Sequence, residues 1–216
     1  MKQFAVIGLG RFGISVAENL QRMGYDVLAI DESEERVNAV ASLVTHTAIA
    51  DSLNEKALRS LGIRNFDVVV VAIGQDIQAS ILTTLHLKEL GCKHVVVKAQ
   101  NEIHGKVLEK IGADHVVFPE RDMGARVAHY LVANNILDYL ELSPEYSLLE
   151  CRAPEKLVGK SLSQLNLRVN MGINVVAIKR SANIDPSPGG HTVIQRDDIL
   201  VVIGLNTDLH SLEQCD

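Results

Sequence analysis

The stretch FAVIGLGRFGISVAENLQRMGYDVLAID, residues 4–31, decides the fold. An apolar run at 4–7 is followed by a glycine turn at 8–13, by apolar residues at helical spacing up to residue 23, and by a second apolar run that ends on an acidic residue. This is the order strand, glycine turn, helix, strand, acid. It predicts a βαβ unit of the dinucleotide-binding type.

Each glycine of the turn has its own physical role. Gly8 permits the tight turn, Gly10 leaves the backbone open to a phosphate, and Gly13 lets the helix pack closely on the strand. The unpaired amides at the helix start, with the positive end of the helix dipole, favour an anion. Asp31, about 20 residues further on, suits two ribose hydroxyls and would repel a 2′-phosphate, so NAD or an adenine nucleotide fits better than NADP.

Composition and charge narrow the class of protein. With 216 residues, 47% of them hydrophobic, the chain can form one full domain and a small second one. The absence of Trp, the few aromatic residues and the net charge of −6 argue against nucleic acid as a partner. Three widely spaced cysteines indicate reduced thiols in a cytosolic protein. We find no leader pattern and no apolar stretch of about 18 residues, so we expect any action at a membrane to pass through a partner.

Strand and helix patterns alternate through the N-terminal part. The further strands are expected at 44–50, 67–73, 94–98 and 115–118, and the helices between them at 34–43, 53–61, 77–90 and 102–111. Such alternation predicts an α/β fold, a Rossmann-like doubly wound parallel sheet over residues 1–118 with helices on both faces.

The pattern changes after Pro119. A helix at 121–137 and a crossover are expected to form a linking segment, residues 119–143. Residues 144–216 then predict a small α+β domain. Its expected elements are strands at 146–151, 174–178, 192–194 and 199–203, and short helices at 162–165 and 207–214.

The ligand of an open α/β sheet lies across the carboxyl ends of its strands. We therefore expect several strand-end residues to border one crevice together with Gly8 and Asp31. They are Asp51, Ser52, Ile73, Gly74, Lys98 and, just beyond the sixth strand, Glu120. Polar strand ends are common, however, and Asp51 and Glu120 are also suited to capping a helix N-terminus.

Catalytic groups are scarce. The C-terminal part offers only His191 and His210 as proton donors, and the chain has no HExxH motif, no G-x-S-x-G elbow and no P-loop lysine motif. A nucleotide site without such groups predicts a sensor rather than an enzyme. Two alternatives stay open: an NAD-dependent oxidoreductase with a minimal substrate domain, and a redox-sensing transcriptional regulator, for which no helix-turn-helix with a basic face is found.

Longer segments carry a family resemblance. They are AVIGLGRFG at 5–13, Asp31, VVVAIGQDIQASILTTLHLKELG at 69–91, KAQNEIHGKVLEKIGADHVVFPERDMGARVAH at 98–129, GINVVAIKR at 172–180 and ILVVIG at 199–204. Together they resemble the RCK (KTN) family, close to the cytosolic Ktr regulators of bacterial potassium uptake. The resemblance runs over essentially the whole chain, as an RCK_N part followed by an RCK_C part.

The resemblance implies an assembly and a set of ligands. It implies dimers that assemble into an octameric ring, docked on the cytoplasmic face of a KtrB/KtrD-type potassium-translocating membrane subunit. In that family ATP favours the active assembly and ADP the inactive one, and NAD or NADH is bound by the same fold. Arg11, followed by Phe12 in the glycine loop, matches the arginine that senses the γ-phosphate on the neighbouring subunit. Lys98 lies where the family lines the site, and Glu120 matches a carboxylate of an intersubunit cation site, suited to Mg²⁺, Ca²⁺ or Na⁺.

The resemblance also implies a second ligand in the C-terminal part. Arg168, Asn174 and Pro188 match the pocket for cyclic di-AMP at the dimer interface of the family. By residue type, Arg168 suits a phosphate and Asn174 an adenine edge, although they equally suit a surface arginine and the start of a strand. The segment 185–190 departs from the family, because it has an extra proline and two glycines where apolar residues are common.

Overall fold

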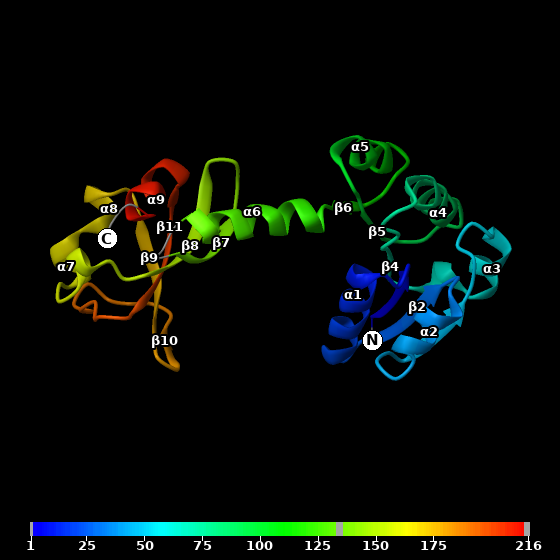
Figure 1. Cartoon of the computed structure of the whole chain (residues 1–216), viewed down its shortest axis with the longest axis horizontal. Coiled ribbons are helices and arrows are strands. Elements are labelled where there is room, and N and C mark those ends of the chain that lie inside the picture. Colours follow the sequence, from blue (N-terminus) through cyan, green and yellow to red (C-terminus); the bar gives the residue numbers. More distant parts are fainter. Residues whose placement is uncertain (1, 133–135, 214–216) are drawn as a thin grey trace. The chain divides into compact units, whose positions relative to one another are not determined.

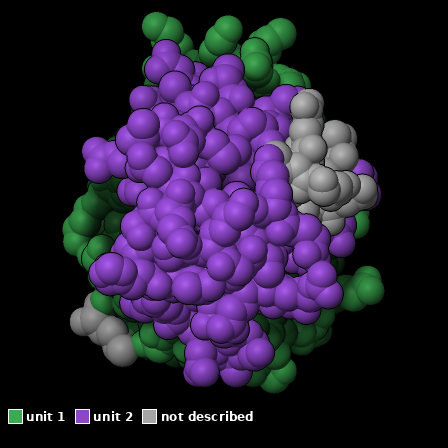
Figure 2. Space-filling view, turned by 90° about the vertical axis from the view of Figure 1, so that its left-hand side faces the viewer, with its two compact units in different colours: residues 1–120 green, residues 121–216 purple. Residues whose placement is uncertain are grey.

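The protein forms two compact units, residues 1–120 and 121–216 (Figure 2). The computed structural model describes residues 2–132 and 136–213, and each unit is described by itself. Figure 1 shows both units, with many of their helices and strands labelled.

The first unit contains a six-stranded parallel sheet with the strand order β3-β2-β1-β4-β5-β6. Because the order reverses between β1 and β4, the ligand crevice of such a sheet is expected beside these two strands. The predicted Rossmann-like doubly wound fold is confirmed. The strands are β1 Gln3–Ile7, β2 Asp26–Asp31, β3 His46–Ile49, β4 Val68–Val71, β5 Val95–Lys98 and β6 His115–Val117.

Helices connect these strands, and most begin at a residue whose side chain caps the helix. Ser33, Asn54, Asp76 and Asn101 each accept a hydrogen bond from a backbone amide in the first turn of the helix that follows. The caps order the loops at the carboxyl edge of the sheet. The helical elements are α1 Arg11–Arg22, α2 Glu34–Val40, α3 Glu55–Ser60, η1 Ile63–Asn65, α4 Ile77–Glu89 and α5 Glu102–Lys110.

The second unit is built on a five-stranded sheet with the order β10-β9-β11-β8-β7, all of whose neighbours are antiparallel. Its core includes Leu149, Leu200 and Val202, which are fully buried. This is the small α+β domain that was predicted. Its elements, with the preceding helix, are α6 Pro119–Val132, β7 Ile136–Glu141, β8 Tyr146–Arg152, η2 Glu155–Leu157, α7 Leu162–Leu165, α8 Leu167–Asn170, β9 Asn174–Arg180, β10 Asn183–Asp185, β11 Ile199–Leu205 and α9 Asn206–Glu213.

The segment between the two sheets differs from its prediction. The helix expected over 121–137 ends at Val132, and Ile136–Glu141 forms strand β7 instead. Residues 133–135 of the predicted helix lie outside the described residues. Apolar spacing allowed either structure locally, and the pairing of β7 with β8 decides for the strand. The strand predicted at 192–194 is also wrong, since Val193 forms only an isolated bridge with Ser161.

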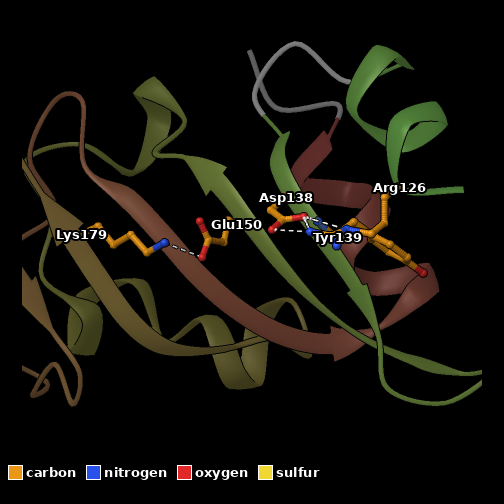
Figure 3. A network of polar contacts seen from close by, with 5 residues as sticks. All are labelled: Arg126, Asp138, Tyr139, Glu150 and Lys179. Carbon is orange, nitrogen blue, oxygen red and sulfur yellow. Dashed lines mark hydrogen bonds and ion pairs between the residues drawn. The ribbon is translucent and has the colours of Figure 1, made fainter. Parts of the chain in front are cut away.

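Polar contacts tie α6 to β7 (Figure 3). Asp138 of β7 accepts hydrogen bonds from Arg126 of α6 at 2.7 and 2.9 Å, and from the Tyr139 backbone amide at 2.8 Å. Within the same sheet, Lys179 of β9 donates to Glu150 of β8 at 2.5 Å. The hydrogen bond from Arg126 holds the pKa of Asp138 below its ordinary value. The charged carboxylate therefore joins the middle of α6 to β7.

A buried hydroxyl network joins β7, β8 and α9, and it gives a first prediction. The fully buried Ser147 Oγ lies 2.7 Å from both the Tyr139 hydroxyl and the Asn206 Oδ1. Because a serine hydroxyl has one proton, which Asn206 receives, the Tyr139 hydroxyl must donate to Ser147.

Tyr139→Phe should lower the free energy of unfolding by about 1 kcal/mol, measured by chemical denaturation. Tyr146→Phe on the exposed side of β8 is the control, and an equal loss in both variants would contradict the role of the network.

Candidate functional site

A cavity of about 890 Å³ lies at the carboxyl edge of the parallel sheet. Its walls come from the carboxyl ends of β1, β2 and β5, from the segments that follow β1, β2, β3 and β4, and from the start of α6. All but one of the sequence-predicted nucleotide residues line it, and Gly13 is the exception. The residues brought together there are Gly8, Gly10, Arg11, Phe12, Asp31, Asp51, Ser52, Ile73, Gly74, Lys98 and Glu120. Their contacts with a ligand stay predictions.

The glycine loop is shaped by close backbone packing. Gly8 has φ +95°, and a Cβ there would lie 3.0 Å from the backbone of Ala72 and Ile73. A Cβ on Gly13 would lie 1.9 Å from the Gly8 carbonyl oxygen, so this glycine lets α1 start directly against the loop. A Cβ on Gly10 would meet no atom within 4 Å. The loop is therefore closed on the protein side and open on the cavity side.

The N-terminus of α1 differs from those of the neighbouring helices. Its N-cap residue is Gly10, which offers no side-chain hydrogen bond, and the first turn contains no acidic residue. The backbone amides of the first turn therefore lack a capping side chain and face a cavity, at the positive end of a 12-residue helix. This arrangement suits a phosphate group.

Asp31 has a second role beside the one expected from the sequence. Its buried carboxylate accepts a hydrogen bond from the Leu9 amide at 2.6 Å and from the Ser33 amide at 2.9 Å. Arg36 lies 3.6 Å from the same carboxylate. Asp31 thus joins the glycine loop to the loop after β2, and it lines the cavity.

Two further loops of the cavity edge are held by side chains. Asp51 accepts from the Leu53 amide at 2.8 Å, and the Ser52 hydroxyl accepts from the Thr83 hydroxyl of α4 at 2.9 Å. The Gly74 carbonyl accepts from the Gln100 side chain. Asp51 thus closes a local turn and does not cap a helix, because Leu53 lies before α3 and the N-cap of α3 is Asn54. Its carboxylate also lines the cavity.

Lys98 and Glu120 form an ion pair inside the cavity. The Lys98 Nζ lies 2.5 Å from the Glu120 Oε1 and 5.8 Å from the centre of the Phe12 ring. Lys98 is buried, whereas the Glu120 side chain is 71% exposed. The hydrogen bond from Lys98 holds the pKa of Glu120 below its ordinary value, and the nearby charge of Arg11 acts in the same direction. At neutral pH Glu120 is thus a carboxylate.

Sequence reasoning missed several residues that line the cavity. Glu32 and Arg36 belong to the first residues after β2, and Gln75 and Asp76 follow β4. Their signal was their place directly after a predicted strand at the ligand edge. The rule for open α/β sheets predicts site residues at strand ends, and it does not extend to the first turn of the helix that follows.

The three residues of the expected second site lie on separate segments of the C-terminal unit. Arg168 is on α8, Asn174 begins β9 and Pro188 follows β10. Within 136–213, no hydrogen bond or ion pair in the structure joins one of these side chains to another. Across the described residues of the whole chain, no three His, Cys, Asp or Glu side chains cluster as a metal site would require.

A Rossmann-type nucleotide-binding unit followed by a small antiparallel domain defines the class of this protein. The sequence matches the TrkA-N domain over residues 4–119 and the TrkA-C domain over residues 149–214. The chain belongs to this TrkA-N/TrkA-C family, the RCK (KTN) family that its motifs indicated. The predicted family is confirmed.

Named relatives match along nearly the whole chain. It is 55% identical over 213 residues to the Ktr system potassium uptake protein C of Bacillus subtilis (strain 168), an alignment that covers 99% of this chain and 96% of the relative. It is 52% identical to the Ktr system potassium uptake protein A of the same organism, covering 98% of this chain and 96% of the relative.

Solved structures share the fold. The GsuK RCK domain aligns with a TM-score of 0.68 at 15% identity, covering 99% of this chain and 47% of that chain. The GsuK channel bound to NAD aligns with a TM-score of 0.54 at 25% identity, covering 100% of this chain and 38% of that chain. GsuK bound to ADP aligns with a TM-score of 0.51 at 27% identity, covering 60% of this chain and 33% of that chain. The chain thus spans less than half the length of each of these proteins.

Proposed function

We propose that this protein is the regulatory subunit of a Ktr-type potassium uptake system, that it senses ATP and ADP, and that it performs no reaction of its own. The observation that carries the proposal is the open glycine loop at the uncapped N-terminus of α1, with Arg11 beside it, facing a cavity of about 890 Å³. The similarity to two Bacillus subtilis Ktr potassium uptake proteins over nearly the full length connects this nucleotide site to potassium uptake.

The ligand proposed for the cavity is an adenine nucleotide. The α1 amides would hold the phosphates and Asp31 the ribose. Arg11 of a neighbouring subunit would distinguish three phosphates from two. A charge-assisted contact of roughly 1.5–3 kcal/mol to the third phosphate is enough to bias a ring between two shapes. The solved GsuK structures with NAD and with ADP support both kinds of nucleotide for this fold, so NAD or NADH is the competing ligand.

A cation is proposed next to the phosphates, with Glu120 as one ligand. Its exposed carboxylate offers the hard oxygen that Mg²⁺, Ca²⁺ or Na⁺ prefers. No acidic, His or Cys cluster surrounds it among the described residues. The chain therefore fits a shared cation site, completed by phosphate oxygens or by a second subunit, rather than a site of its own.

The proposed assembly is a homo-oligomeric ring, an octamer built from dimers, bound to the inner face of the cell membrane through a KtrB/KtrD-type subunit. A nucleotide-dependent change in ring shape would pass to that subunit. None of the helices in the described ranges, 2–132 and 136–213, has the length and apolar character of a membrane span.

Arg11→Ala tests the proposed switch. In calorimetric titration of nucleotide-free protein, the variant should bind ATP roughly ten- to a hundredfold more weakly than wild type and bind ADP almost unchanged, because only ATP offers the third phosphate. Arg22→Ala, at the other end of α1 and paired with Glu18, is the matched control and should bind both nucleotides like wild type.

Other results of the same titration would overturn the ATP switch. If only NAD or NADH binds, or if Arg11→Ala weakens ATP and ADP equally, a redox-linked function becomes the better explanation. A substrate-dependent change in nicotinamide absorbance would then support the oxidoreductase alternative.

A second, inhibitory ligand, cyclic di-AMP, is proposed for the C-terminal unit at Arg168, Asn174 and Pro188. Arg168→Ala should abolish its binding while leaving ATP binding intact, since the substitution is on α8 of the other unit. Absence of binding to the wild-type protein would remove this part of the proposal without affecting the nucleotide site.

A further inference from the structure

The Lys98 ammonium lies inside the nucleotide cavity, between two of its walls. The Phe12 ring of the glycine loop is 5.8 Å away, and a Cβ built on Gly74 would lie 3.6 Å from the Lys98 Nζ. On the side of α6 the ammonium lies 2.5 Å from Glu120. The positive charge is thus placed between the phosphate loop and the opposite wall, and a carboxylate of the same chain already holds it.

The two partners of this ion pair depend on it to very different degrees. The Lys98 side chain is only 10% exposed, and Glu120 is the one carboxylate that pairs with it among the described residues. A buried ammonium needs an anionic partner, because it has lost most of its water. Glu120, which is mostly exposed, can return to water at little cost. Lys98 therefore needs an anion, but nothing in its surroundings requires that anion to be Glu120.

The charges around the cavity give a reason for an exchange. Five carboxylates line it against three cationic side chains, so the lining is net negative. A polyphosphate that enters meets this field, and the one buried cation that could offset it is neutralised by Glu120. Release of Lys98 from Glu120 would supply an unpaired positive charge beside the glycine loop, where the phosphates are proposed to bind.

We propose that Glu120 acts as a built-in competitor of the nucleotide for Lys98. In the nucleotide-free protein Lys98 binds Glu120, and on nucleotide binding Lys98 turns to phosphate oxygens and releases the Glu120 carboxylate. This inference rests on the proposed nucleotide site and gives Lys98 a phosphate-binding role there. It also makes the proposed cation ligand conditional, because Glu120 is free to coordinate only after phosphates have taken its partner.

Binding of ADP to the full chain in EDTA, without divalent cations, tests the exchange. Removal of a competitor should strengthen binding, so Glu120→Gln should bind ADP about three- to tenfold more tightly than wild type. Lys98→Met should bind it more weakly. If Glu120→Gln weakens ADP binding, Glu120 does not compete for Lys98 and the proposal is overturned.

Removing any carboxylate from the cavity lining would strengthen the binding of an anionic nucleotide. A reference variant is therefore needed to measure this general effect of charge. Glu32→Gln removes an exposed carboxylate of the same lining, and its gain measures this general effect. In the wild-type background, the gain in ADP affinity from Glu120→Gln should exceed the gain from Glu32→Gln. In the Lys98→Met background, the two gains should be equal. Equal gains from the two carboxylate variants in wild type would refute the exchange.

Folding and the proposed function are tested separately. Glu120 is exposed, so Glu120→Gln should fold even if loss of the buried Lys98 proves harmful, and its comparison with Glu32→Gln decides the question without the lysine variant. If wild type binds no ADP or ATP, the proposed nucleotide site fails together with the exchange. If wild type binds ADP and the two carboxylate variants behave alike, the exchange alone fails.

Discussion

Gly13→Ala should destabilise the N-terminal unit by about 3 kcal/mol, because an added Cβ would approach another atom more closely here than at any other glycine. The added Cβ would lie 1.9 Å from the Gly8 carbonyl oxygen and 3.1 Å from the Ala72 Cβ. Since the first atom belongs to the backbone, relief requires α1 to move away from β1. For a chain of this size such a loss lowers the melting temperature by about 6–12 °C, which differential scanning calorimetry would measure.

Gly10→Ala is the matched control, because it adds the same methyl group three residues earlier. A Cβ at Gly10 meets nothing within 4 Å, and the backbone there has φ −77°, which alanine adopts readily. Stability should stay within about 0.5 kcal/mol of wild type, whereas ADP binding should weaken because the methyl group enters the phosphate path. A large stability loss at Gly10, or none at Gly13, would contradict the described shape of the loop.

Asp198→Ala should cost the C-terminal unit about 1.5–3 kcal/mol, because it removes a buried carboxylate that accepts charge-assisted and backbone hydrogen bonds. Asp198 is 1% exposed and accepts from Arg180 at 2.8 and 2.7 Å and from the Gln195 amide at 2.8 Å. The variant would leave that amide without its acceptor, while the Arg180 guanidinium, whose side chain is 43% exposed, keeps its hydrogen bond to the Val193 carbonyl. Urea denaturation followed by circular dichroism measures the loss.

The exposed neighbour Asp197 provides the control. It pairs with Arg152 at 3.2 Å in water, and Asp197→Asn keeps a residue that tolerates its φ of +66°. We expect a change below about 1 kcal/mol. If the two aspartate variants lose the same stability, burial of the Asp198 pair is not what stabilises the unit.

The stabilisation by Asp198 should also depend on pH. The hydrogen bonds from Arg180 hold the pKa of Asp198 below its ordinary value. A carboxylate with a lowered pKa in the folded state stabilises fully above its unfolded pKa of about 3.9, and the contribution is lost as the pH falls through the folded value. The difference between wild type and Asp198→Asn should therefore be constant near neutral pH and shrink in acid.

The N-terminal fold could be predicted from the sequence because its signals are local. The run at 67–73 and the glycine turn at 8–13 each specify one structure by composition alone, and each agrees with its neighbours. Strand β7 could not be predicted in this way. Its residues Ile136–Glu141 continue the apolar spacing of α6, and only the pairing with β8 and the Tyr139 hydroxyl network distinguish a strand from a helix.

The candidate site shows the same division. The rule that ligands lie at the carboxyl ends of parallel strands predicted that Asp31, Lys98 and Glu120 border one crevice, and all three line the same cavity. That rule says nothing about how the side chains pair. The bond from Leu9 to Asp31 and the ion pair between Lys98 and Glu120 join residues 22 positions apart, and no spacing in the sequence announces either one.

The capped helices at the cavity edge have a thermodynamic consequence. Ser33 and Asp76 fix the loops that follow β2 and β4 through their own hydrogen bonds, and Asp31 fixes the glycine loop. A ligand that enters finds these segments already ordered, so it loses little affinity to their conformational entropy. Affinity for the features shared by all adenine nucleotides is then nearly constant, and selectivity rests with the long side chains, above all Arg11 and Lys98, whose positions a phosphate can change.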